Sequence, residues 1–130
     1  ADDVGIEFDG HALTLVMYAD RLFNGEYSAL RPEALATLSA VDGLLAQAPR
    51  AALGISGHAD GTSLTALDRY ADNVRQSYDL AQMVYAALRG MPGGIDGHHP
   101  VIEGSGDART IATAATEEGR RKNRRVEMKR

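Results

Sequence analysis

Hydrophobic and polar residues recur along the chain in patterns that separate strands from helices. The first clear pattern is HALTLVMYADRLF, which alternates imperfectly, is rich in strand formers and predicts a strand near residues 12–19. RPEALATLSAVDGLLAQAP then predicts a helix, with Pro32 at a first helical position and Pro49 at its end. Helical spacing predicts four core-facing side chains in it: Leu35, Leu38, Val41 and Leu45.

The second half of the chain is again predicted to contain strands and helices. RAALGISG is a short apolar run that predicts a central strand, and a short helix over residues 66–72 and a long one over 73–89 should follow. The expected core stripe of the long helix is Val74, Tyr78, Ala81, Val84, Tyr85 and Leu88. VIEGSGD predicts a third strand, RTIATAATEEGR a loop with a short helical turn, and NRRVEMKR a last strand in which Val126 and Met128 face the helices.

Strands separated by helices indicate an α/β fold. We expect a two-layer sandwich of βαβαβ type, a mixed sheet of about four strands with helices on one face, because right-handed crossovers place both helices on the same side. The 130 residues are enough for one core, so residues 1–130 are expected to form a single domain. Loops at strand ends are the expected place for a ligand in such a sheet.

The composition of the chain argues against several kinds of chemistry and partner. The chain has no cysteine, which excludes disulfides and thiolate chemistry, and no apolar run approaches the length of a membrane span. Seven of the 14 lysines and arginines lie in residues 120–130. This basic tail carries no aromatic residues to stack on bases, so we expect no nucleic-acid partner and interpret the tail as a strand end packed against an acidic body.

Three segments resemble the OmpA-like domain, the peptidoglycan-binding module of outer-membrane proteins, peptidoglycan-associated lipoprotein and flagellar stator (MotB-like) proteins. LFNGEYSALRPEALATL is similar to the opening of the family, and ISGHADG is similar to its GHTD loop, with Ala59 in place of threonine. GSGDARTIATAATEEGRRKNRRVEM matches the closing signature. The resemblance covers nearly the whole chain, and it implies the C-terminal part of a longer, membrane-anchored envelope protein, in the periplasm of a Gram-negative bacterium.

The resemblance also implies a site. In the family, the aspartate of the GHTD loop and an arginine of the following helix grip meso-diaminopimelate in the peptidoglycan stem peptide, and the aspartate corresponds to Asp60. We expect its carboxylate to face an open crevice. The glycines of the loop would let backbone approach a ligand closely. The expected ligand-binding residues are Asp60, Gly57, Gly61, Thr62, Ser77 and Arg124.

The arginine of the family has no counterpart, because the aligned position is Leu80. A neutral side chain cannot pair with a carboxylate, and three interpretations stay open. Arg75, Arg69 or Arg124 could supply the cation, and Arg124 should lie on the helix side of the last strand with Val126 and Met128. Alternatively the ligand differs, or the site no longer binds and the domain is a scaffold that acts through protein contacts or dimerisation.

Catalytic and metal sites are less favoured by the sequence. His58, Asp60 and Ser63 lie in one loop, whereas the members of a catalytic triad usually come from separate elements. His98 and His99 are adjacent in a glycine-rich segment that suggests a solvent-exposed turn rather than a zinc site. We therefore expect a binding module without enzymatic activity, cofactor or metal, whose partner is peptidoglycan and which could form a homodimer as stator-like domains do.

Overall fold

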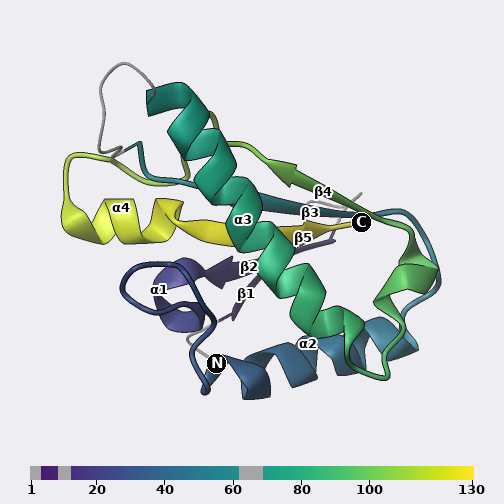
Figure 1. Ribbon diagram of the computed structural model, residues 1–130. Helices are drawn as coiled ribbons and strands as arrows, with labels where there is room; N and C mark the ends of the chain where they lie inside the picture. The colour runs from purple at the N-terminus through teal and green to yellow at the C-terminus, as the bar shows by residue number, and fades with distance from the viewer. Residues whose placement is uncertain (1–3, 9–12, 62–68) are drawn as a thin grey trace.

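A five-stranded sheet forms one layer of the molecule, and helices cover one of its faces (Figure 1). The computed structural model describes residues 4–8, 13–61 and 69–130, with side chains for 13–61 and 72–130. The strands are β1 (Val4–Phe8), β2 (Leu13–Tyr18), β3 (Leu53–His58), β4 (Pro100–Gly104) and β5 (Arg125–Lys129). The helices are α1 (Ala19–Leu22), α2 (Ala34–Gln47), α3 (Arg69–Arg89), the 3₁₀ turn η1 (Ile95–His98) and α4 (Glu117–Asn123).

The strands follow the order β1-β2-β5-β3-β4. The pair β3–β4 is parallel and is connected through α3, whereas the pairs β1–β2, β2–β5 and β3–β5 are antiparallel. The predicted mixed sheet with helices on one face is therefore confirmed. The count of about four strands is one too low, because the sequence analysis did not recognise β1, a five-residue strand that completes the edge of the sheet beside β2.

The core lies between the sheet and the two long helices. Met17, Ile55 and Val126 contribute from the sheet, and all three are completely buried. In α2 the predicted core residues Leu38, Val41 and Leu45 are buried, but Leu35 is 53% exposed. The helix begins at Ala34, and the buried stripe runs from there at spacings of four, three and four residues. Leu35 lies about 100° around the helix from Ala34 and so points to solvent.

Helix α3 is one continuous helix from Arg69, where two helices were expected; residues 62–68 lie outside the described part of the chain. Its predicted stripe is confirmed for Ala81, Val84 and Leu88, which are buried. Tyr78 is 41% exposed, and Leu80 and Ser77 are buried instead, so the stripe is rotated slightly from the predicted one. None of the helices described here is long and apolar enough to cross a membrane.

Two glycines bring α3 very close to the sheet. A Cβ atom on Gly57 of β3 would lie 1.7 Å from the carbonyl oxygen of Ser77, and one on Gly104 of β4 would lie 2.4 Å from that of Val74. Only glycine has the space for this contact. The contact fixes the N-terminal half of α3 over the ends of β3 and β4, next to the loops that carry the predicted site.

Candidate functional site

The ends of three neighbouring strands meet at one edge of the sheet and bring acidic residues together. In the register of the sheet, Arg125 at the start of β5 lies opposite both Tyr18 of β2 and His58 of β3. The residues just beyond these positions are Asp20 in α1 and Asp60 after β3. Arg124 immediately precedes β5. The strand order β2-β5-β3 therefore places the guanidinium of Arg124 between two carboxylates from distant parts of the chain.

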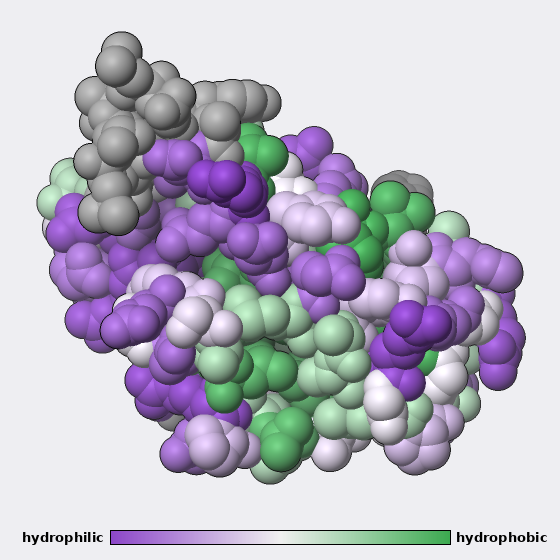
Figure 2. All heavy atoms as spheres, viewed as in Figure 1, coloured by the Kyte–Doolittle hydropathy of each residue, from purple (hydrophilic) through white to green (hydrophobic). Residues whose placement is uncertain are grey.

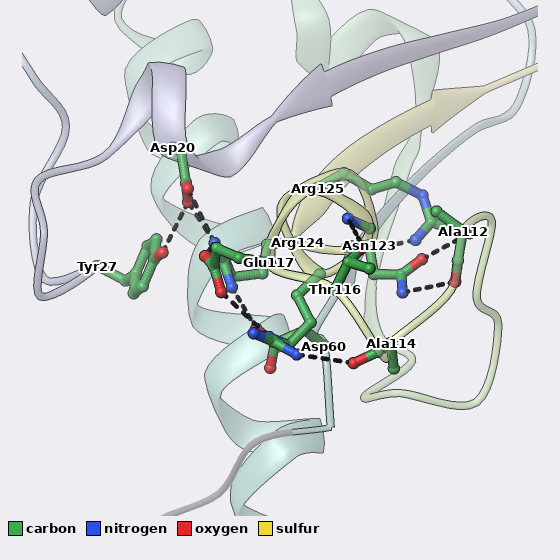
Figure 3. Close-up of polar contacts among 12 residues, drawn as sticks. Asp20, Tyr27, Asp60, Ala112, Ala114, Thr116, Glu117, Asn123, Arg124 and Arg125 are labelled. Carbon is green, nitrogen blue, oxygen red and sulfur yellow. Dashed lines mark hydrogen bonds and ion pairs between the residues drawn. The ribbon is translucent and has the colours of Figure 1, made fainter.

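Arg124 binds three carboxylates at once (Figure 3). Its Nε and Nη2 donate to the two oxygens of Asp20, at 3.2 and 2.9 Å, and Nη1 donates to Oδ2 of Asp60. Nη2 also donates to Oε1 of Glu117, the first residue of α4, at 2.8 Å. Paired planar contacts of this kind suit the fork of donors on a guanidinium. We call Asp20, Asp60, Glu117 and Arg124 the acidic cluster.

Contacts with Arg124 favour the ionised forms of Asp20 and Glu117 in the acidic cluster. Burial by itself would raise the pKa of Asp20, but hydrogen bonds from Arg124 and Tyr27 outweigh it, and the pKa is lowered. The hydroxyl of Tyr27 donates to Asp20 at 2.6 Å, and burial together with this bond raises the pKa of Tyr27 to about 12. Burial opposes the charge on Arg124, yet the three carboxylates raise its pKa. One guanidinium facing three carboxylates leaves the cluster with an excess of negative charge.

Asp60 does not face an open crevice, and that expectation is wrong. The residue is only 7% exposed, and Arg124 covers its carboxylate. The more accessible carboxylates of the cluster are those of Asp20 and Glu117, whose side chains are 29% and 53% exposed. A cationic ligand that approaches this edge of the sheet therefore meets Asp20 and Glu117 before it meets Asp60.

Two of the predicted ligand-binding residues, Gly57 and Ser77, take part in packing. Gly57 lies under the backbone of α3, and Ser77 is completely buried. The hydroxyl of Ser77 donates to the carbonyl of Val74 at 2.8 Å and accepts from the amide of Gly106 at 2.9 Å, so it joins α3 to the loop after β4.

The other two predicted residues, Gly61 and Thr62, follow β3 in the sequence. Gly61 adopts a left-handed backbone with φ of 88°, beside Asp107, and this conformation favours glycine. Thr62 lies outside the described residues.

The position where the family has an arginine is part of the core. Leu80 is 3% exposed and packs within the main hydrophobic cluster. Among the three candidate cations, Arg124 contacts Asp60, whereas Arg75 pairs with Asp72 on the surface of α3. The side chain of Arg69 lies outside the described part of the structure. Arg124, the residue directly before β5, thus supplies a cation to Asp60.

The sequence analysis missed Asp20, Tyr27 and Glu117 as members of the site. Glu117 lies in the segment predicted to be a loop with a short helical turn, and Asp20 lies in the strand-like pattern HALTLVMYADRLF. An acidic residue directly after a predicted strand was the available signal for Asp20, because such residues gather at one edge of a sheet. Tyr27 comes from a turn, and nothing local indicates its contact with Asp20.

The histidines occupy separate places. His58 is buried, with its Nε2 3.0 Å from Oγ of Ser56 and 3.7 Å from Oε1 of Glu127, while Ser63 lies outside the described residues. His98 is buried and its Nε2 lies 3.0 Å from the carbonyl oxygen of Leu45, so the expectation of a solvent-exposed turn is wrong for this residue. The described residues contain no group of three potential metal ligands close enough to hold an ion.

Comparisons with known proteins place this chain beside envelope proteins. No protein-family model matches it. The probable lipoprotein YiaD of Escherichia coli is 31% identical over 125 residues, which are 96% of this chain, and the chain spans about half of that relative, 54% of its length. The cell wall anchor of the T6SS from Pseudomonas aeruginosa superposes with a TM-score of 0.83 at 29% identity, over 98% of this chain and 87% of that one.

A putative MotB-like protein from Desulfovibrio vulgaris superposes with a TM-score of 0.84 at 26% identity, over 98% of this chain and 78% of that one. The agreement extends over the whole sheet and its helices, because nearly all of this chain is covered in each superposition. These similarities confirm the resemblance seen in the sequence: the chain has the fold of the OmpA-like and MotB domains.

Proposed function

We propose that this chain is a non-catalytic module that binds peptidoglycan and anchors or positions an envelope protein at the cell wall, in the periplasm of a Gram-negative bacterium. The observation that carries the proposal is the match over 98% of the chain to the cell wall anchor of the T6SS from Pseudomonas aeruginosa, combined with a charged site at the strand ends. The similarity to a probable lipoprotein supports an envelope location.

The acidic cluster supplies the chemistry for a cationic group of the wall. The stem peptide offers an ammonium on diaminopimelate, and an ammonium is a strong donor to carboxylates. Asp20 and Glu117 are the accessible acceptors, and Asp60 would join them if the ligand shares or replaces its contact with Arg124. Arg124 thereby holds the carboxylates in position before the ligand arrives.

Retention of the domain by purified sacculi tests the proposal. The parent chain should sediment with sacculi. Asp60→Ala should sediment at least about tenfold less, because removal of one half of a charge pair commonly costs several kcal/mol. Asp79→Ala is the matched control: it removes an exposed carboxylate of α3 away from the cluster and should sediment like the parent. Equal retention of the parent and Asp60→Ala would show that Asp60 is not part of the binding site.

A scaffold that no longer binds the wall is the second candidate. The burial of Asp60 beneath Arg124 favours it, because an internally paired carboxylate has less to offer a ligand. In that case neither the parent nor any variant sediments with sacculi. The same protein would then act through protein contacts or dimerisation, which sedimentation equilibrium of the parent chain would detect as a mass above that of one chain.

A further inference from the structure

An apolar pocket of about 200 Å³ opens at the end of the sheet away from the acidic cluster. The cluster lies at the start of β5, next to Arg124, whereas the pocket lies at the end of this strand, where Met128 and Arg130 belong to its lining. In Figure 1 the C-terminus and α4 lie well apart. The pocket is therefore separate from the proposed peptidoglycan site.

The lining of the pocket is mainly aliphatic. Three neighbouring strands each contribute one buried residue: Leu15 of β2, Met128 of β5 and Leu53 of β3. The end of α2 and the residue after it contribute Leu44, Leu45 and Ala48. Several of these side chains belong to the main core, so the pocket reaches the core from the surface.

The wall formed by α2 is exposed and carries no charge. Leu44 is 53% exposed, and Leu13 at the start of β2, which also lines the pocket, is 40% exposed. Asp42 is the one charged residue of α2, and it is buried. Figure 2 shows hydrophobic residues along the lower part of this face, where α2 lies in Figure 1. Because a surface helix usually carries charged or polar residues on its outer face, this wall favours an apolar ligand.

Arg130 is the charged member of the lining. Its Nη2 donates to the carbonyl oxygen of Pro49 at 2.7 Å, and its backbone amide donates to that of Leu13 at 3.3 Å, so the residue connects the end of α2 to the sheet. In the part of the chain that the structure describes, no carboxylate side chain pairs with Arg130. A guanidinium has five N–H donors, so donors remain for an anion after the bond to Pro49.

The size of the pocket and the position of its charge restrict the ligand. A volume of about 200 Å³ is below the range of pockets that enclose a whole small molecule, roughly 300–1,000 Å³, and suits a narrow aliphatic chain. Arg130 lies in the lining itself, so the anionic group has to be attached directly to the chain. A free fatty acid has this arrangement, whereas the acyl chain of a phospholipid ends in an uncharged ester and the phosphate lies further away.

We infer that the pocket at the end of β5 binds the aliphatic chain of a free fatty acid, with Arg130 as the partner of its carboxylate. The chain is stabilised by burial against Leu15, Leu53 and Met128, and the carboxylate by charge-assisted hydrogen bonds. The proposed function does not use this site, so either proposal can be right without the other.

The test uses octanoate, hexanoate and octylammonium, each titrated into ¹⁵N-labelled protein and followed through the amide shifts of β2, β5 and the end of α2. Octanoate should bind about tenfold more tightly than hexanoate, because hexanoate buries two methylene groups fewer. Octanoate should also bind at least about tenfold more tightly than octylammonium, the order expected for the loss of charge-assisted hydrogen bonds.

Two variants separate the apolar part of the site from its charge. Ala48→Leu places a larger side chain in the pocket and should weaken octanoate binding at least about tenfold, whereas Ala46→Leu adds the same side chain at an exposed position of α2 and should bind like the parent. Arg130→Gln should weaken octanoate binding about tenfold without weakening that of octylammonium. Arg89→Gln is its control, because Arg89 lies in the last turn of α3 and pairs with Asp96.

Several outcomes would overturn the inference. Absence of saturable shifts with octanoate would show that the parent has no such site, and parent-like binding by Ala48→Leu would place the ligand elsewhere. Equal binding of octanoate and octylammonium, or an Arg130→Gln variant that binds octanoate like the parent, would remove the carboxylate from the assignment. Asp60→Ala should bind octanoate as the parent does, so a failure of the proposed function would leave this result unchanged.

Discussion

Arg124 organises the site at the scale of single residues. Three carboxylates from α1, the loop after β3 and α4 converge on its guanidinium, and the ring of Tyr27 lies 5.9 Å from its Cζ atom. Without Arg124, the carboxylates of Asp20 and Asp60 would repel each other while partly buried. The residue therefore stabilises the same arrangement that would receive a ligand.

Replacement of Arg124 tests this role. We expect Arg124→Gln to lower the free energy of unfolding by about 3 kcal/mol, because the variant leaves partly buried carboxylates without their cation. Arg124→Lys should recover less than half of the loss, since an ammonium cannot bind both oxygens of Asp20 through a planar fork as the guanidinium does. Urea denaturation measures both values.

Arg75→Gln is the control, because the pair of Arg75 with Asp72 is exposed and should contribute no more than about 1 kcal/mol. Equal stability of Arg124→Gln and the control would show that the cluster does not depend on its arginine.

At the scale of elements, the position of α3 depends on two glycines in the strands beneath it. Gly57 and Gly104 leave room for the helix backbone near Ser77 and Val74, and Ser77 then binds the amide of Gly106 in the loop after β4. The amide of Ala59 donates to the carbonyl of Gly106 at 2.7 Å. The contact between helix and sheet thus fixes the position of the loop that leads into Asp60.

Two glycine replacements with opposite expected effects test the contact. Gly57→Ala should lower the free energy of unfolding by about 2–3 kcal/mol, because its Cβ would lie 1.7 Å from the oxygen of Ser77 and α3 would have to move. Gly43→Ala should raise it by about 1 kcal/mol, since Gly43 lies inside α2, a methyl group added there would meet no atom within 4 Å, and alanine is the better helix former. Thermal unfolding measures both. An unchanged free energy of unfolding in Gly57→Ala would mean that α3 moves without destabilising the fold.

At the scale of the whole molecule, the face of the sheet away from α3 carries a buried polar group near the site. Glu127 contacts both His58 and Arg125 there, and Arg125 also donates to the carbonyl oxygens of Asn123 and Arg109. These bonds attach the segment after β4 to β5. Burial and the charge of Arg125 lower the pKa of His58 to about 4, although Glu127 acts in the opposite direction.

This shift predicts how stability depends on pH. In the unfolded chain His58 has a pKa near 6.5, so below that pH the unfolded state takes up a proton that the folded state does not. The free energy of unfolding should have its full value above about pH 6.5. It should fall by about 2–3 kcal/mol as the pH drops to about 4. Urea denaturation at several pH values measures the slope, and His58→Gln should flatten it in this window.

The exposed His99 provides the comparison, since His99→Gln should keep the slope of the parent. An unchanged slope in His58→Gln would show that His58 titrates normally in the folded protein.

Local patterns predicted most elements because apolar spacing reflects which face of a helix or strand is buried. They placed Leu38, Val41 and Val126 in the core correctly. They failed for Leu35 and Tyr78, where the boundary of the apolar stripe depends on how the helix is rotated against the sheet. They also missed β1, because a five-residue strand becomes recognisable mainly through its antiparallel partner β2.

The sequence by itself determined the class of fold and the family it resembles, since each depends on spacing within short segments, and it led to the prediction of a site at the loop that carries Asp60. Only the tertiary structure decided which cation Asp60 meets. The contact of Arg124 with Asp20 joins residues 104 positions apart, and it exists because β5 inserts between β2 and β3. Partners chosen by strand order leave no periodic signal along the chain, and for this reason the charge pairs of the candidate site could not be predicted from the sequence.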